Sequence, residues 1–195
     1  MLLIPIVIVV SAYIIGSIPT GVLVARVFGA GDPRSAGSGN IGATNVARTV
    51  GKKAGLITLA GDILKGALPT YIAAAFSLNP WTIGLTGLFV LLGHLFPLFL
   101  GFKGGKGVAT AGGVIGAISL PVLLICSVVF LAGALSTRYV SAGSILSALI
   151  APIAFSFILK EPAYAIMGMV ISALVIYRHK ENIQRLRQGK ENRFF

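Results

Sequence analysis

The chain has 195 residues, of which 56% are hydrophobic and 11% are charged. A soluble domain carries about 25% charged residues, so this composition excludes a soluble domain with a membrane anchor and predicts an integral membrane protein. The formal net charge of +11 raises the alternative of nucleic-acid binding. Because the basic residues lie in short segments between apolar runs, membrane lipids and phosphorylated substrates are the expected partners, and no nucleic acid.

The first apolar run, residues 2–25, is long enough to cross a bilayer and lacks a basic segment before it, so we expect a retained helix. Residues 26–53 then form a long basic loop. Further spanning helices are expected, in chain order, over residues 54–77, 82–100, 139–159 and 163–177. The basic tail from Arg178 onward predicts a short amphipathic helix at the membrane surface.

Residues 108–136 could form one long helix or a short helical hairpin that turns near Pro121. A hairpin gives seven transmembrane helices, with the N-terminus outside and the C-terminus in the cytoplasm. It also places every Lys and Arg except Lys65 and Lys160 on the cytoplasmic side. Because cytoplasmic loops carry an excess of positive charge, this count favours the hairpin. The expected fold is therefore an all-α integral membrane protein with seven spans, and the helix limits within residues 108–136 stay open.

Three polar segments meet at one membrane face in this topology: residues 37–48, 101–107 and 178–187. The first, GSGNIGATNVAR, combines glycines with small hydroxyl and amide side chains and has no acidic residue. Such a loop can turn backbone N–H groups toward an anion, and the glycine-rich GFKGGKG segment can do so again. Each segment alone could be an ordinary turn or a signal of topology. Their placement on one face predicts an anion-binding enzyme site beside the lipid.

Two nucleotide-binding motifs are weak here. Gly37, Gly39 and Gly42 match GxGxxG, but an expected membrane helix precedes them where a dinucleotide fold needs a strand. The GFKGGKG segment resembles a phosphate loop, yet Lys106 is followed by glycine and lacks the hydroxyl that binds Mg²⁺. What remains is an anion-binding nest of backbone amides with lysine charge beside it.

Each ionisable residue within the expected spans could serve either the packing of the helices or the binding of a substrate. Asp62 and Lys65 are three residues apart on a helix, so they form a buried ion pair or leave Lys65 to bind phosphate. His94 is a hydrogen-bonded packing residue or a member of the site. No spacing of histidine, cysteine and acidic residues fits a catalytic metal, so neither a metal nor another cofactor is expected.

The polar segments together resemble a known family. The residues that carry the resemblance are Ser38-Gly39-Asn40 with Gly42, Thr44 and Asn45, then Gly93-His94-Leu95-Phe96-Pro97, then Lys103-Gly104-Gly105-Lys106-Gly107-Val108-Ala109-Thr110, and finally His179-Lys180-Glu181-Asn182-Ile183. Motifs of these kinds, in this order and over nearly the whole chain, are similar to those of PlsY, the bacterial acyl-phosphate:glycerol-3-phosphate acyltransferases.

This resemblance implies transfer of an acyl group from acyl phosphate to the 1-hydroxyl of sn-glycerol 3-phosphate, the first step of bacterial phospholipid synthesis. The products are lysophosphatidic acid and phosphate. It further implies a single membrane-embedded catalytic domain, residues 1–195, in the bacterial cytoplasmic (inner) membrane, with its active site on the cytoplasmic face. No obligate protein partner is expected, and oligomeric state and acyl-chain preference stay open.

The resemblance also implies roles for residues. Ser38, Arg48, Lys106, His179 and Asn182 would hold glycerol 3-phosphate. Acyl phosphate would be held, and its carbonyl polarised, by Asn40, Thr44, Asn45 and the backbone of Gly104, Gly105, Lys106 and Gly107. Gly39 and Lys103 complete the expected substrate-binding set, and the expected catalytic residues are Ser38, Asn40, Lys106 and His179. Either His179 or a substrate phosphate oxygen would take the hydroxyl proton.

Two rival functions remain for such a chain. A transporter or channel for a phosphorylated solute would want polar residues along its spans, whereas residues 82–100 and 139–159 are nearly uncharged. A lipid-binding scaffold would not need two separate phosphate-binding loops. Both rivals explain the polar segments less well than an acyltransferase.

Overall fold

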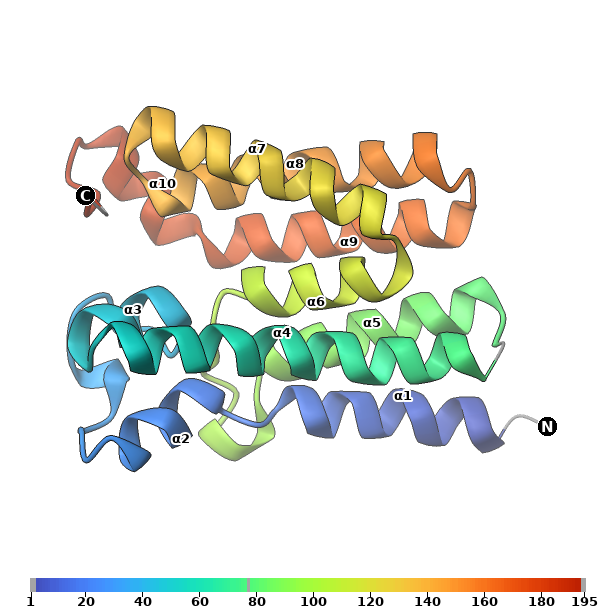
Figure 1. Ribbon diagram of the computed structural model, residues 1–195, viewed down its shortest axis with the longest axis horizontal. Helices are drawn as coiled ribbons and strands as arrows, with labels where there is room; N and C mark the ends of the chain where they lie inside the picture. Colours follow the sequence, from blue (N-terminus) through green and yellow to red (C-terminus); the bar gives the residue numbers. More distant parts are fainter. Residues whose placement is uncertain (1–2, 77, 194–195) are drawn as a thin grey trace. The chain divides into compact units, whose positions relative to one another are not determined.

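The computed structural model describes residues 3–76 and 78–193, and over these ranges the regular structure is entirely helical (Figure 1). The chain divides into two compact units, Met1–Ile118 and Ser119–Phe195. The prediction of an all-α protein is therefore confirmed for the described residues.

The first unit is built around one long helix. Its elements are α1 (Leu3–Gly16), α2 (Thr20–Val27), η1 (Pro33–Ser35), α3 (Ala43–Thr49), α4 (Lys52–Ala75), α5 (Pro80–Leu95), η2 (Leu98–Leu100) and α6 (Val108–Ile118). Helix α4 runs the length of this unit, and α1, α2, α3, α5 and α6 all pack against it (Figure 1). The first glycine-rich segment lies between α2 and the end of α3, the second lies between α5 and α6, and all four of these helices contact α4.

The expectation of one continuous helix over residues 2–25 was wrong. Helix α1 ends at Gly16 and helix α2 begins at Thr20, with a bend of 42° between them. Pro19 causes the break, because a proline ring has no N–H to donate and clashes with the carbonyl one turn earlier. Helix α2 restarts with hydrogen bonds from Val22 and Leu23 to the Pro19 carbonyl.

Helix α5 covers only part of the apolar stretch Pro80–Leu100, which is long enough to cross a bilayer and matches the expected span over residues 82–100. It ends at Leu95, and Phe96 has φ −130° and ψ 65°, outside the helical region. The cause is Pro97, since a proline disfavours the α conformation in the residue before it. The chain therefore leaves the helix just before the glycine-rich loop.

Glycines let the helices of this unit approach closely. A side chain at Gly16 or Gly93 would collide with backbone atoms where α1 and α5 cross. At the crossing of α4 and α6, Gly66 and Gly113 meet backbone atoms in the same way. Small residues at such crossings are typical of helices packed in a membrane.

The second unit contains α7 (Leu120–Thr137), α8 (Val140–Ile158), α9 (Pro162–Arg178) and α10 (Lys180–Arg187). Helix α8 packs against both α7 and α9. Helix α10 leaves α9 at a bend of 57°, as expected for a separate tail helix. Its α-helical form is confirmed, whereas its place at the membrane surface stays a prediction.

Residues 108–136 form two helices, and the break lies at Ser119. The Ser119 hydroxyl accepts a hydrogen bond from the Val122 amide, and Pro121 lies in the first turn of α7, so sequence signals for a helix start coincide there. The two helices are unequal, with 11 residues in α6 and 18 in α7.

Four helices over the described residues are long and apolar enough to cross a bilayer, or up to six if each bent pair counts as one span. Helix α6 is a shorter apolar helix. The seven-span count and the orientation in the membrane therefore stay predictions.

Candidate active site

The first polar segment is held in shape by the side chain of Asn45, which is 2% exposed at the start of α3. Its Nδ2 donates to the carbonyls of Pro33 and Asn40, each at 2.8 Å, and of Ala36 at 3.2 Å. Its Oδ1 accepts the Ser38 amide at 2.8 Å. One buried amide thus ties four points of the loop to a helix, and both kinds of polar atom in that amide are used.

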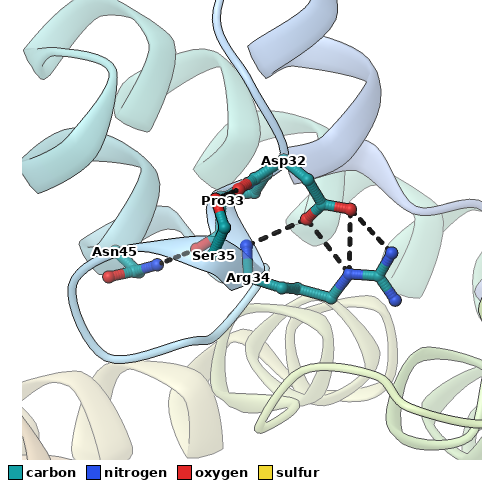
Figure 2. A network of polar contacts seen from close by, with 5 residues as sticks. All are labelled: Asp32, Pro33, Arg34, Ser35 and Asn45. Carbon is teal, nitrogen blue, oxygen red and sulfur yellow. Dashed lines mark hydrogen bonds and ion pairs between the residues drawn. The ribbon is translucent and has the colours of Figure 1, made fainter.

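An ion pair stabilises the entry to this loop. Figure 2 shows the Asp32 carboxylate accepting hydrogen bonds from the backbone and guanidinium of Arg34, and Asn45 donating to Pro33 beside it. The hydrogen bond from the Arg34 side chain holds the pKa of Asp32 below its usual value. Because both side chains are partly exposed, with 36% of Arg34 and 35% of Asp32 accessible, their contribution to stability is small.

The side chains of Ser38, Thr44 and Arg48 take no part in these hydrogen bonds. Ser38 and Thr44 are half-buried, and the Arg48 side chain is exposed on α3. Asn40 spends its Oδ1 on the Gly42 amide at 2.8 Å. The expected loop over residues 37–48 needs one correction, because α3 begins at Ala43 and places Thr44 and Arg48 on a helix. Sequence reasoning missed this helix because seven residues are too few for a clear apolar period.

The second glycine-rich segment is seated on the end of α5. The Gly104 amide donates to the Leu95 carbonyl at 3.2 Å, and the Gly105 amide donates to the His94 carbonyl at 3.1 Å. A side chain on Gly105 would collide with the imidazole ring of His94. Gly107 has φ +82°, a conformation that favours glycine. The backbone course of this loop is therefore fixed, with Lys103 exposed and Lys106 half-buried.

A buried charged cluster lies among the helices of the first unit. The Nζ of Lys65 is 2.9 Å from Oδ1 of Asp62, and Nδ1 of His94 is 3.5 Å from the same oxygen. Lys65 also donates to the Ile18 carbonyl at 2.8 Å. Of the two readings of Asp62 and Lys65, the structure shows the buried ion pair, and it adds His94 to it.

The third polar segment belongs to the second unit. His179 and Asn182 are buried, and Nδ1 of His179 lies 2.7 Å from the Val175 carbonyl oxygen. A carbonyl can only accept, so Nδ1 carries the hydrogen and Nε2 is the nitrogen that can take a proton in the neutral ring.

Sequence reasoning missed Glu191, which bonds the predicted site residue Asn182. Its carboxylate accepts hydrogen bonds from Asn182 at 2.6 Å, Ser141 at 2.8 Å and Arg185 at 2.7 Å. Burial opposes its ionisation, but these three donors outweigh that effect and hold the pKa of Glu191 below its usual value. The available signal was an isolated acid in a strongly basic tail. The carboxylate orients Asn182, one of the predicted substrate ligands.

The structure thus brings the first two polar segments into one unit and the third into the other. Their convergence into one site stays a prediction. Over residues 3–76 and 78–193, no group of three His, Cys, Asp or Glu side chains could hold a metal ion.

Comparison with known proteins assigns the chain to a family. Residues 6–189 match the family described as glycerol-3-phosphate acyltransferase. The chain belongs to the glycerol-3-phosphate acyltransferase family. The matched range includes every predicted site residue and runs through both units.

Curated relatives and solved structures agree with this assignment. The glycerol-3-phosphate acyltransferase of Geobacter sulfurreducens is 49% identical over 94% of this chain and 94% of its own. That of Aquifex aeolicus is 48% identical over 95% of this chain and 97% of its own.

Among solved structures, the chain is similar to PlsY, an integral membrane glycerol 3-phosphate acyltransferase, in its glycerol 3-phosphate form. The TM-score is 0.92, with 46% identity over 98% of this chain and 96% of that one. The lysophosphatidic acid form matches with a TM-score of 0.89 and 45% identity, over 97% and 94% of the two chains. With the apolar helices described above, this likeness makes the protein a multi-pass integral membrane protein, and the resemblance to PlsY seen in the sequence is confirmed.

Proposed function

We propose that this protein transfers an acyl group from acyl phosphate to the 1-hydroxyl of sn-glycerol 3-phosphate, giving lysophosphatidic acid and phosphate. The observation that carries the proposal is the pair of loops in the first unit, each of which has a fixed backbone and combines glycines with basic side chains. Two anionic reactants need two such places. The PlsY structures with glycerol 3-phosphate and with lysophosphatidic acid support one substrate and one product.

Acyl phosphate is proposed as the donor because the site offers charge neutralisation and positioning more than covalent chemistry. Phosphate is a good leaving group, so the donor is already activated. The glycerol phosphate hydroxyl attacks the acyl carbon, an ester C–O bond forms, and the bond from that carbon to the phosphate oxygen breaks. The enzyme then needs to hold two anions in contact and stabilise charge at the carbonyl oxygen.

The proposed residue roles are those that the resemblance to the PlsY family implies, with one change that the structure suggests. Ser38, Arg48, Lys106, His179 and Asn182 would hold glycerol 3-phosphate. Asn40, Thr44 and the backbone of Lys106 and Gly107 would hold acyl phosphate, with Gly39 and Lys103 beside them. The amides of Gly104 and Gly105 donate to carbonyls of α5, so these two glycines would shape the loop. Asn45 differs from its predicted role, because its donors are committed to three backbone carbonyls. We propose that Asn45 fixes the conformation of the loop and does not touch the substrate.

The hydroxyl proton has two candidate acceptors. One is a phosphate oxygen of a substrate, and the other is Nε2 of His179, which the hydrogen bond from Nδ1 to Val175 leaves as the basic nitrogen. A His179→Gln variant separates them, since a general base contributes up to about 10⁴-fold to turnover. A loss of that size with substrate binding intact identifies His179 as the base, and a small loss identifies the substrate.

The membrane arrangement proposed with this function has seven spans and residues 1–195 acting as one catalytic domain. The active site would face the cytoplasm from the bacterial inner membrane. Glycerol 3-phosphate is water-soluble and the acyl chain is not, so a site at this boundary gives access to both.

The direct test uses the purified protein with palmitoyl phosphate and glycerol 3-phosphate. Formation of lysophosphatidic acid with release of an equal amount of phosphate supports the proposal. A matched reaction with palmitoyl-coenzyme A tests the donor, and no product is expected from it. Product from the thioester but none from palmitoyl phosphate would overturn the proposed donor while leaving the acceptor in place.

A further inference from the structure

One carboxylate of the first unit, that of Asp62, contacts two basic side chains that in turn contact the supports of the two glycine-rich loops. Asp62, Lys65 and His94 come from α4 and α5, and all three side chains are at least nine-tenths buried. The Asp62 oxygen lies 2.9 Å from the Lys65 ammonium and 3.5 Å from Nδ1 of His94. Two basic side chains on different helices thus share a single acidic partner.

Lys65 connects this cluster to the support of the first loop. Lys65 donates to the Ile18 carbonyl at the break between α1 and α2, where the helical hydrogen-bond pattern is interrupted before Pro19. Helix α2 starts just after this point, and its Gly21 abuts the backbone of Ile41 so closely that a side chain there would collide with the Ile41 carbonyl. Helix α2 also contacts η1, so Lys65 fixes the start of the helix that supports residues 33–42.

His94 connects the cluster to the second loop. The His94 carbonyl accepts the Gly105 amide at 3.1 Å, and the Nε2 edge of the ring lies where a Gly105 side chain would be. The opposite nitrogen, Nδ1, faces Asp62. A carboxylate on that side favours one ring orientation, as second-shell carboxylates do for histidines elsewhere. The orientation of the ring in turn sets the surface on which Gly104–Gly107 rest.

We propose that Asp62 is a positioning residue shared by the two anion-binding loops, acting on residues 33–42 through Lys65 and on residues 101–107 through His94. Asp62 touches neither substrate in this account. Loss of its charge loosens both loops at once, whereas loss of Lys65 or His94 loosens mainly one. The effect on substrate binding rests on the proposed function, while the effect on the loops does not.

Amide hydrogen exchange reports on the loops without any need for activity. The hydrogen-bonded amides of Ser38 and Gly42 report on the first loop, and those of Gly104 and Gly105 report on the second. Lys65→Met is expected to speed exchange in residues 33–42, His94→Asn in residues 101–107, and Asp62→Asn in both. Thr70→Val is the control, because Thr70 is buried on the same helix but bonds only the Gly66 carbonyl of that helix.

Asp62→Asn leaves Lys65 buried without its carboxylate and could prevent folding. The double variant Asp62→Asn with Lys65→Met removes both charges and provides a second test. Faster exchange in residues 101–107 is again expected. Unchanged exchange in both loops of either Asp62 variant would overturn the proposal. So would faster exchange spread evenly over all the helices, because that is loss of stability in general.

Kinetics then test the consequence for binding. In Asp62→Asn, the KM values for both substrates are expected to rise about tenfold with kcat within about threefold, the pattern of lost positioning for binding. A fall in kcat with both KM values unchanged would overturn the positioning role. If the wild-type protein shows no acyl transfer while Asp62→Asn still loosens both loops, the proposed function fails and the positioning inference stands.

Discussion

The amide of Gly105 donates a 3.1 Å hydrogen bond to the carbonyl of His94, and the same glycine lies against the edge of the His94 ring. This pair joins the last turn of α5 to the loop that carries Lys103 and Lys106. Only a residue without a side chain fits there, so the course of the backbone depends on glycine for reasons of space.

Gly105→Ala is therefore expected to displace the second loop and raise KM by about tenfold or more. The added methyl group would overlap the imidazole ring, which is held by its own buried neighbours. Steady-state kinetics with each substrate varied in turn measure the effect. Gly31→Ala is the matched control, because nothing lies within 4 Å of the added carbon there. Equal KM values in the two variants would contradict this account of the loop.

Asn45→Asp tests the first loop with almost no change in shape. The substitution replaces an amide donor to three backbone carbonyls by an oxygen that repels them, so we expect activity to fall by about 100-fold or more. The loop should also become accessible to protease in the absence of substrate. Asn79→Asp is the control, since Asn79 caps α5 through its oxygen, which aspartate retains. Near-normal activity of Asn45→Asp would mean that the amide donors are dispensable.

Arg48→Gln compares an arginine that we propose binds substrate with Arg34, which pairs with Asp32 in the fold. Arg48 is exposed on α3 and takes no part in the hydrogen bonds of the loop, so its loss should raise KM for an anionic substrate by about 10- to 100-fold. Arg34→Gln removes a guanidinium that pairs with Asp32, and less than about threefold change is expected from this partly exposed pair. The comparison fails if Arg34→Gln is the more damaging of the two.

The contribution of Glu191 should depend on pH with a definite sign. Its pKa is lowered on folding, so the carboxylate stabilises the folded state at pH values above its ordinary pKa near 4.5. That stabilisation is lost as pH falls through the lower folded value. Glu191→Gln should therefore lower the thermal unfolding temperature at pH 7, and the difference from wild type should shrink as the solution is acidified below about 4.5. A difference that is constant or grows toward acid would show that the charge is not responsible.

Much of the fold could be predicted because apolar runs and glycine or proline boundaries are strong local signals. The starts of α7 and α9 coincide with Ser119 and Pro162, which cap or open helices for reasons visible in the sequence. The break at Pro19 was missed because hydropathy continues through it, and only the missing N–H of proline interrupts the helix.

The candidate site was predictable in composition but not in its internal bonds. The residue types of Gly37–Arg48 predict an anion-binding loop, and that role stays a prediction. The role of Asn45 depends on backbone carbonyls that the fold brings around it. His94 and Glu191 were harder still. Their partners lie on other elements, and no local spacing shows that Asp62 or Asn182 is near.

The central claim is that Ser38, Lys106 and His179 share one membrane face around the bound substrates. Single cysteines introduced as Ser38→Cys, Lys106→Cys and His179→Cys, in a protein with Cys126→Ala, can be labelled in sealed vesicles with a membrane-impermeant maleimide. The account predicts that all three positions react from the cytoplasmic side and that glycerol 3-phosphate protects each of them. Reaction of any one position from the opposite side would contradict it.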